Sequence, residues 1–519
     1  MIEEGGEKQI CSPFPHLSRA GPGRQTTCTA ATAPTKRSHF HSGSYSVHAV
    51  YSISDLIRDK MWMEIFLGFV ALFLVLYFYV TKNFNRYKDL SVPFEKGVFP
   101  FGSYNFISGA HFDIQTEEIH RKFENQKYFG HFLFGKPIVG INDPDVLKQI
   151  QVKDFDHFVD RTSLETTKKF FAGGDLDALW AKQLTNLGGD DWKEVRAAFT
   201  PIFTSGKMKG MLKFIMQVSE DLTNEFDKKA KAGEEFELKD VFGKFSLDAL
   251  ASSAFGVNGE SFTNDKSVFV KHAKRVFQIK FMDVMHIIAR MIPGSQYVYG
   301  AFKINTTAPE ATKFFKDVIT QSIRMRKESK ERKNDLIDLM LDVIKEDIKE
   351  EDKDECEDQY EKDMKLKNNG RRRKQIDEDH VVATAMALLM AGYDTTGMTL
   401  SYLAYQLSKD EEVQTRLQEE IDEAFEESGG KFPDYNVIQS LPYLDMVIHE
   451  TLRVYTLVGA NFRNCEKDYK LPDSNIYLKK GDGISYNARV LHTNPKYWSH
   501  PDEFYPEHFS KEEKVNRNP

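Results

Sequence analysis

The chain has 519 residues and a formal charge of -8, and its charge pattern does not point to nucleic acid as a partner. Its 70 basic and 78 acidic residues are mixed along the sequence, so no large field of one sign arises. Hydrophobic residues make up 41% of the chain and aromatic residues 13%, which excludes a largely disordered protein and indicates a bulky apolar interior. The four cysteines are widely separated and form neither a disulfide framework nor a CxxC metal site, so a reducing compartment fits.

The first 60 residues are rich in Ser, Thr, Pro, Gly and His and show no sustained period, which predicts disorder. Met61 reads as a natural initiator for the apolar stretch that begins there. Residues 1–60 are therefore interpreted as disordered or as a non-native upstream extension.

Residues 61–82 are predicted to form a transmembrane anchor. The stretch from Ile65 to Val80 carries no charge, and Trp62, Tyr77 and Tyr79 suit the two membrane interfaces. A buried core helix and a cleaved signal peptide are the alternatives, but no small-residue cleavage site comes after the stretch. Three cations come after it instead and place the downstream side in the cytosol, namely Lys82, Arg86 and Lys88.

The remaining chain is predicted to be one large domain. Residues 83–105, with spaced Pro and Gly, read as a connector, and residues 106–519 as the domain. Helical patterns dominate, strand-like pieces such as "SNIYLKKGDGISYNA" are few and late, and a charged insertion occupies about residues 346–376. The predicted fold class is mainly α with small β-sheets.

The predicted helix at residues 380–408 is apolar nearly all round, so it should lie at the centre of the domain. One charge interrupts it, Asp394, with Thr395 directly after it. Asp394 could cap a fresh helix. Alternatively, Gly392 leaves room for a flat ligand, and the carboxyl group and the Thr395 hydroxyl handle a small polar species such as dioxygen.

A second motif is "LPYLDMVIHETLRVY" at residues 441–455. Glu450 and Arg453 share one helix stripe with apolar neighbours, so they are expected to be buried together as a structural lock. An E-x-x-R pair alone is common and contributes little on an exposed helix. "HETLR" also begins like the H-E-x-x-H zinc motif, but Arg453 stands where the second histidine should be, so a zinc protease is rejected.

A third motif is "GGDDWKEVR", in which Asp190 or Asp191 is predicted to cap a helix. Trp192 and Arg196 lie in this helix at i, i+4. They could stack on each other, or donate together to a ligand carboxylate.

The three motifs, in this order and after a membrane anchor, resemble those of the cytochrome P-450 family, specifically its animal microsomal drug- and steroid-oxidising branch. The likeness runs from about residue 61 to residue 509. It implies that Asp394 and Thr395 form the proton relay and that the cofactor is haem. It also implies that the haem propionates are held by Trp192, by Arg196 and by the arginine of "FRNC", Arg463.

Two departures from the family pattern stand out. Thr456 replaces a frequent proline after the lock helix, and the P-x-R-F box reads "PEHF", so that His508 stands where arginine would complete the network with Glu450 and Arg453. The family's haem-ligating cysteine comes after that box, so we expect the axial cysteine beyond Pro519, a chain truncated before it, and no metal ligand in this sequence. Cys465 is a poor substitute, because its neighbours do not match the F-x-x-G-x-R-x-C-x-G loop.

The resemblance implies a haem-thiolate monooxygenase that inserts one oxygen atom of O2 into a lipophilic small molecule, such as a xenobiotic, a steroid or a fatty acid. Its expected partners are an NADPH-dependent flavoprotein reductase and the endoplasmic reticulum membrane, with the domain in the cytosol and no nucleic acid. One alternative is a haem-free product that acts as a membrane-tethered interaction protein. Another is a haem-thiolate isomerase or dehydratase, against which Asp394 and Thr395 argue.

Overall fold

The computed structural model describes residues 46–515, except residues 89, 91, 107, 162–163, 258, 263–266, 279, 293, 330–331, 333–334 and 346–375. The predicted disorder of residues 1–45 and nearly all of the predicted charged insertion lie outside the described residues. The chain divides into two compact units, Met1–Leu72 and Phe73–Pro519.

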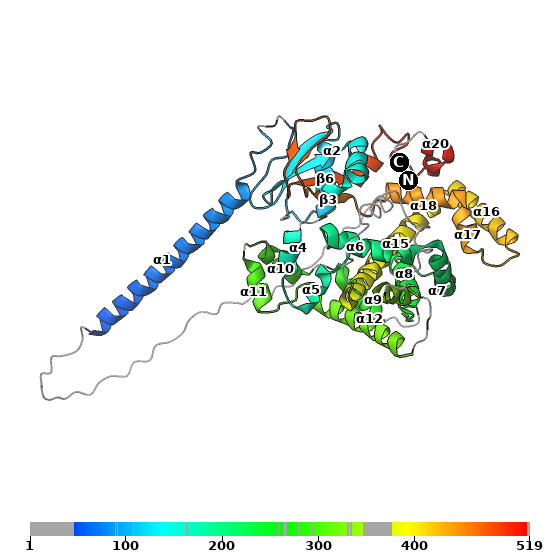
Figure 1. Cartoon of the computed structure of the whole chain (residues 1–519), viewed down its shortest axis with the longest axis horizontal. Coiled ribbons are helices and arrows are strands. Elements are labelled where there is room, and N and C mark those ends of the chain that lie inside the picture. The colour runs from blue at the N-terminus through cyan, green and yellow to red at the C-terminus, as the bar shows by residue number, and fades with distance from the viewer. Residues whose placement is uncertain are drawn as a thin grey trace, which may run out of the picture. The chain divides into compact units, whose positions relative to one another are not determined.

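The helix α1 extends over Ser46–Thr81 (Figure 1). Residues 46–60 are therefore helical, and the prediction of disorder is wrong for them, because Val50, Ile53 and Ile57 recur at helical spacing. The part from Lys60 to Thr81 is long and apolar enough to cross a membrane.

A four-stranded sheet lies in the second unit, with strand order β1-β2-β6-β3. Its strands are β1 (Tyr128–Leu133), β2 (Lys136–Ile141), β3 (Ala460–Asn464) and β6 (Gly483–Asn487). β1 and β2 form an antiparallel hairpin, β6 runs parallel to β2, and β3 runs antiparallel to β6. A two-stranded sheet pairs β4 (Tyr469–Lys470) with β5 (Tyr477–Leu478). The late strands lie in and beside the predicted strand-like piece, whereas the β1–β2 hairpin was not predicted.

A chain of buried polar side chains crosses this sheet. Nδ1 of His120 lies 2.8 Å from Oδ1 of Asn142, and Nε2 of His120 lies 3.1 Å from the Ser485 hydroxyl. Ser485 Oγ lies 2.7 Å from Nε2 of His131, and Nδ1 of His131 lies 3.3 Å from the Tyr104 hydroxyl. The Asn142 amide nitrogen donates to two main-chain carbonyls, so its oxygen faces His120 and accepts the Nδ1 proton. Burial lowers the pKa of both histidines, so they are neutral at pH 7: Nε2 of His120 then accepts from Ser485, whose Oγ accepts from Nε2 of His131, and Nδ1 of His131 accepts from Tyr104.

This chain of side chains predicts that the second unit loses stability as the pH falls below about 6.5. Burial lowers the pKa of His120 to about 4, although its hydrogen bond to Asn142 opposes the shift, and burial lowers the pKa of His131 well below the usual value. The unfolded histidine takes up its proton at higher pH than the folded one. His120 alone should therefore lower the free energy of unfolding by about 3 kcal/mol between pH 6.5 and pH 4.

The measurement is the free energy of urea unfolding at a series of pH values. His120→Gln should flatten this pH dependence, while His449→Gln, which alters an exposed histidine, should leave it unchanged. An unaltered slope in His120→Gln would show that these histidines do not titrate as described.

The rest of the second unit is mostly helical, which confirms the predicted class of mainly α with small sheets. The longer helices are α2 (Phe112–Lys122), α6 (Gly189–Phe199), α7 (Ser205–Ala232), α8 (Leu238–Phe255), α9 (Val268–Phe277), α10 (Phe281–Met291), α12 (Pro309–Ser329), α13 (Leu336–Lys345), α15 (Glu378–Lys409), α16 (Glu411–Glu427) and α18 (Pro442–Val454). The shorter ones are α3 (Pro144–Lys148), α4 (Leu164–Phe170), α5 (Asp175–Ala181), α11 (Ser295–Ala301), α17 (Tyr435–Ser440), α19 (Ala488–His492) and α20 (Lys511–Val515). Short turns are η1 (Gln149–Lys153), η2 (Phe155–His157), η3 (Thr200–Phe203) and η5 (Pro506–Phe509).

The helix α15 is central, because α5, α8, α9, α12, α13 and α18 all pack against it (Figure 1). Val381, Ala385 and Leu389 of its N-terminal half are buried with Leu247 of α8 and Ile319 of α12. Each fully buried Val, Leu or Ile side chain contributes about 1.5–3 kcal/mol. This apolar packing fixes the position of the candidate catalytic residues in the next turns of α15.

Candidate active site

Asp394 lies inside an unbroken helix. α15 runs without interruption over Glu378–Lys409, so the alternative that Asp394 caps a fresh helix is wrong. The side chain is 25% exposed, and its Oδ1 lies 3.3 Å from Nζ of Lys239 on α8. The carboxylate is therefore paired and partly hydrated, and it avoids the penalty of an unpaired buried charge. The sequence alone did not reveal Lys239, because nothing near either residue signals a contact between helices so far apart in the chain.

Thr395 lies on an open side of the same helix. Its hydroxyl donates a 2.6 Å hydrogen bond to the carbonyl oxygen of Ala391, one turn back, as predicted for a mid-helix threonine. Ala391, Thr395 and Thr396 are exposed, whereas the intervening Tyr393 is buried. An accessible strip thus comes after the buried part of the central helix. Asp394 and Thr395 face different partners, one toward Lys239 and the other toward its own helix.

Gly392 does not serve the predicted purpose of leaving room for a flat ligand. A Cβ atom at Gly392 would lie 2.7 Å from Cδ1 of Leu250 on α8. A Cβ atom at Gly397 would lie 3.2 Å from Cα of Gly243 on the same helix. Both glycines therefore allow α8 and α15 to approach each other closely, and the expectation for Gly392 is corrected.

Glu450 and Arg453 form a fully buried ion pair on α18. Nε and one terminal nitrogen of Arg453 each lie 2.7 Å from a carboxylate oxygen of Glu450, and the two side chains are 0% and 1% exposed. The predicted burial of this helix stripe is thus confirmed, while Asp445 and His449 are 47% exposed. Such a bidentate pair has the geometry in which a guanidinium binds a carboxylate most strongly.

Arg453 also holds the chain beyond α19. Its remaining N–H groups donate to the main-chain oxygens of His492 and Pro501 at 2.8 Å and of Glu503 at 2.7 Å. All five N–H donors of the guanidinium are therefore used. The side chain links α18 to a stretch of otherwise irregular structure.

His508 donates a hydrogen bond to the carboxylate of Glu450. Its Nδ1 lies 3.2 Å and 3.3 Å from the two Glu450 oxygens, and the main-chain N–H of His500 points at its Nε2 from 3.4 Å. A main-chain N–H can only donate, so Nε2 accepts and Nδ1 carries the proton. Burial would raise the pKa of Glu450, but hydrogen bonds from Arg453, His508 and the N–H of Tyr505 outweigh it and lower this pKa.

Thr456 replaces the frequent proline with a second polar link. Its hydroxyl donates to the Arg453 carbonyl oxygen at 3.1 Å and lies 2.9 Å from Nδ1 of His492. The residue thus ties the end of α18 to α19, so this departure from the family pattern has a structural use.

The predicted propionate-binding residues fall into two groups. The ring of Phe155 has the Trp192 ring 5.8 Å away and the Arg463 guanidinium 5.3 Å away. Arg463 also donates a 2.9 Å hydrogen bond to the Val159 carbonyl oxygen. Arg196 lies one turn beyond Trp192 on α6 and is exposed. The structure therefore brings Trp192 and Arg463 together through Phe155, and it places Arg196 at the surface.

The prediction that Asp190 or Asp191 caps α6 is wrong. The first residue of the helix is Gly189, and its N-cap residue, Gly188, has no side chain to offer. Oδ1 of Asp160 accepts the Gly189 N–H at 2.6 Å instead. A carboxylate from a distant segment thus takes the role that the local sequence suggested for its neighbours.

These side chains fit a haem by the chemistry they offer. An indole N–H and two guanidinium groups are donors suited to the two propionate carboxylates of haem. The accessible strip beside Thr395 carries only small side chains in the middle of a large unit. The residues present therefore suit the carboxylate edge and the face of the cofactor.

Cys465 does not fit as an iron ligand. It is fully buried among Phe158, Leu471 and Ile484, and its Sγ donates to the Lys467 carbonyl oxygen at 2.7 Å. Burial raises the pKa of this thiol to about 11, so it is not a thiolate at neutral pH. Among the residues that the structure describes, no group of three or more His, Cys, Asp or Glu could hold a metal ion.

We expect Cys465→Ser to lower the free energy of unfolding by about 1 kcal/mol, because the hydroxyl can keep the hydrogen bond to Lys467 but replaces a thiol among apolar side chains. Haem bound per protein, measured from the pyridine haemochrome spectrum, should be unchanged at temperatures where the variant is folded. Loss of haem at unchanged stability would instead make Cys465 the ligand.

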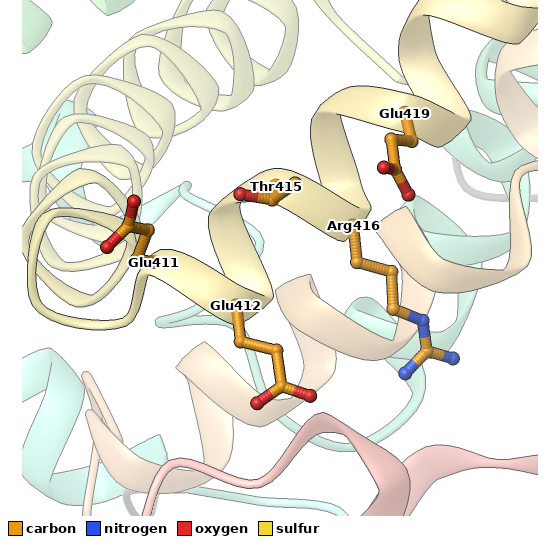
Figure 2. Close-up of a pocket in the computed structure, with 5 residues that line it drawn as sticks. All are labelled: Glu411, Glu412, Thr415, Arg416 and Glu419. Atoms are coloured by element: carbon orange, nitrogen blue, oxygen red, sulfur yellow. The ribbon is translucent and has the colours of Figure 1, made fainter.

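A surface groove on α16 is unrelated to this site. Figure 2 shows its five lining residues, all of them exposed, which are Glu411, Glu412, Thr415, Arg416 and Glu419. Arg416 reaches away from it to pair with Glu507 and to cover the Tyr443 ring, 3.9 Å from its centroid. A single charged helix face lacks the apolar walls of a site for a lipophilic ligand.

Comparisons with known proteins agree with the motifs on α6, α15 and α18. The family model described as Cytochrome P450 matches residues 93–519. Cytochrome P450 3A14 of Cavia porcellus is 31% identical over 465 residues, which cover 89% of this chain and 84% of that protein. Cytochrome P450 3A11 of Mus musculus is 30% identical, with 86% and 81% covered, and Cytochrome P450 9e2 of Blattella germanica is 30% identical, with 89% and 86% covered. A match of this extent, together with the buried lock and the central helix, shows that the chain belongs to the cytochrome P450 family of haem-dependent monooxygenases.

Proposed function

We propose that the chain inserts one oxygen atom of O2 into a lipophilic small molecule, such as a xenobiotic, a steroid or a fatty acid. The observation that carries this proposal is the accessible Thr395 strip on a central helix that is otherwise buried. Bound haem would supply the binding and activation of O2. Electrons would come from an NADPH-dependent flavoprotein reductase.

The proposed proton relay uses Thr395 and Asp394 in turn. The Thr395 hydroxyl holds its proton toward the Ala391 carbonyl oxygen and can rotate to donate it to an oxygen atom on the open side of α15. Asp394, which is one quarter exposed, would return a proton from solvent once it turns away from Lys239. Lys239 therefore joins the relay as a positioning residue.

Two sets of residues are proposed to hold the cofactor and to brace the structure around it. Trp192 and Arg463, both near the Phe155 ring, and Arg196, one turn further along α6, would hold the propionates. Glu450, Arg453 and His508 would brace the core beside the bound haem.

The decisive test is the absorption spectrum of the reduced, CO-treated protein, with parallel assays of NADPH and O2 consumption and of product formation. A red-shifted band together with product that depends on NADPH supports the proposal. Bound haem with turnover that needs no O2 would favour isomerase or dehydratase chemistry. Absence of bound haem would favour an interaction protein.

We also propose that the chain is held at the endoplasmic reticulum membrane by residues 61–82, with residues 83–105 as the connector and the domain from residue 106 in the cytosol. The apolar helix from Lys60 to Thr81 supports this proposal. A second apolar surface on and beside α10 and α11 supports it too, through the exposed side chains of Phe281, Met282, Met285, Ile288, Ile292, Tyr297 and Phe302. A lipid bilayer would cover such a surface.

Tyr297→Trp should report this contact in the full-length chain. Tyr297 is 76% exposed, and Tyr477, a matched control in the small β4–β5 sheet, is 58% exposed. In vesicles of brominated lipid, fluorescence quenching should increase in Tyr297→Trp relative to the parent chain, and it should not increase in Tyr477→Trp. Equal quenching in both variants would argue against a specific membrane face.

A further inference from the structure

A buried ion pair connects α5 with α10. Arg290 donates from one terminal nitrogen to Oδ2 of Asp177 at 2.6 Å, and the two side chains are 1% and 0% exposed. Its other terminal nitrogen points at the carbonyl oxygens of Lys169 and Ala172 from 3.4 Å and 3.3 Å. One guanidinium thus reaches from α10 to both ends of the turn that precedes α5.

Asp177 also holds the segment between α11 and α12. Its carboxylate accepts the main-chain N–H groups of Thr306 and Thr307 and the Thr306 hydroxyl, all at 3.0 Å. In return, the Asn305 side-chain oxygen accepts the N–H groups of Leu176 and Asp177 at 3.0 Å and 3.2 Å. We call residues 303–308 the strap, because this segment lies across the start of α5.

The strap is held in a conformation that its sequence does not favour. Lys303 and Ala308, at its two ends, have φ of 48° and 39°, which non-glycine residues rarely adopt. A Cβ atom at Gly173 would lie 2.4 Å from the Ile304 carbonyl oxygen, so this approach requires glycine. The contacts to α5 therefore offset backbone strain, and the strap would relax once they are lost.

Among the described residues, few polar contacts join α10 and α11. Tyr299 of α11 lies under the Arg290 guanidinium at 4.2 Å, and its hydroxyl lies 2.9 Å from Nδ1 of His286. Nε of Arg290 is buried without a hydrogen-bond partner among the residues that the structure describes. The outer side chains of both helices are largely exposed. This hairpin thus depends on Arg290 for its attachment to α5.

We propose that Asp177 and Arg290 form a latch that closes the α10–α11 hairpin and the strap over α5. Opening of this latch admits lipophilic ligands to the interior beside α15. The second statement rests on the proposed function, since α5 packs directly on α15, the helix that also carries Thr395. The existence of the latch itself does not depend on the proposed function, and it is tested without haem.

The first experiment is hydrogen–deuterium exchange of the full-length chain in lipid nanodiscs. In Asp177→Asn, peptides covering residues 172–181 and 284–308 should exchange about tenfold faster or more, with α15 and the sheet unchanged. Asp335→Asn is the matched control, because it breaks the buried Arg326–Asp335 pair elsewhere in the same unit. It should leave both segments protected.

Thr306→Val is a milder variant, which removes one hydroxyl donor to Asp177 and should accelerate exchange in the same two segments by a smaller factor. If Asp177→Asn proves unstable, Thr306→Val still decides the question. Unchanged exchange in both segments, or equal acceleration throughout the unit, overturns the latch.

The ligand step is measured on haem-loaded protein as the rate at which 1-phenylimidazole shifts the haem absorption. Faster binding in Thr306→Val than in the parent chain supports gating by the latch, and equal rates overturn it. A chain that takes up no haem contradicts the proposed function, while the exchange data still decide whether the latch exists.

Discussion

Glu450→Gln is expected to lower the free energy of unfolding of the second unit by about 3–5 kcal/mol. The substitution keeps the size of the side chain but leaves the Arg453 charge buried without its counter-ion, at a site where both side chains are at most 1% exposed. Domains typically have only about 5–15 kcal/mol of stability, so much of the purified chain should be unfolded or aggregated at 37 °C. Urea unfolding and soluble yield measure the effect.

The control removes a pair of the same charge type that is exposed. Asp317→Asn breaks the Lys313–Asp317 pair on α12, whose side chains are 69% and 60% exposed, and it should cost about 0.5 kcal/mol or less. His508→Arg tests whether the histidine only stands in for the usual arginine. If Glu450→Gln costs no more than Asp317→Asn, the buried pair is not a lock.

Thr395→Ala is expected to reduce product formed per NADPH consumed by about 100-fold or more, because proton transfer by a positioned side chain contributes about 10²- to 10⁴-fold. The hydroxyl accounts for one hydrogen bond within α15, so stability should hardly change. The ratio of product to NADPH separates this loss from a failure to bind substrate, which would lower both rates together.

Two neighbouring variants make that result specific. Thr395→Ser keeps a hydroxyl at the same position and should retain most of the product formed per NADPH consumed. Thr396→Ala alters the adjacent exposed threonine and should have little effect. An equal loss of product per NADPH in Thr395→Ala and Thr396→Ala would place the relay elsewhere on this strip.

The burial of the Glu450–Arg453 pair could be predicted from the sequence, because the two residues are one helical turn apart. A pair at i, i+3 on an apolar stripe is set by helix geometry, so the burial of Glu450 and Arg453 is a consequence of the local pattern. The same holds for the central position of α15, whose sequence is apolar nearly all round.

Contacts between distant segments could not be predicted in this way. The pairing of Asp394 with Lys239 and the capping of α6 by Asp160 depend on how helices and loops meet in space. In both cases the local sequence offered a plausible but wrong explanation. The β1–β2 hairpin was missed for a different reason. Its Tyr, Phe, Ile and Val residues carry a strand signal that lies within a long region of helical patterns.

Three of the five hydrogen bonds of Arg453 reach residues 492–503, so the shape of this segment is partly encoded outside those residues. Three of their main-chain oxygens are placed by one side chain of α18. A synthetic peptide with this sequence would keep the local turns at Asn494 and His500 but lose the three contacts that fix its path against α18. Grafting it into another protein would succeed only if α18 and its arginine were transferred as well. The two segments therefore form a single structural unit.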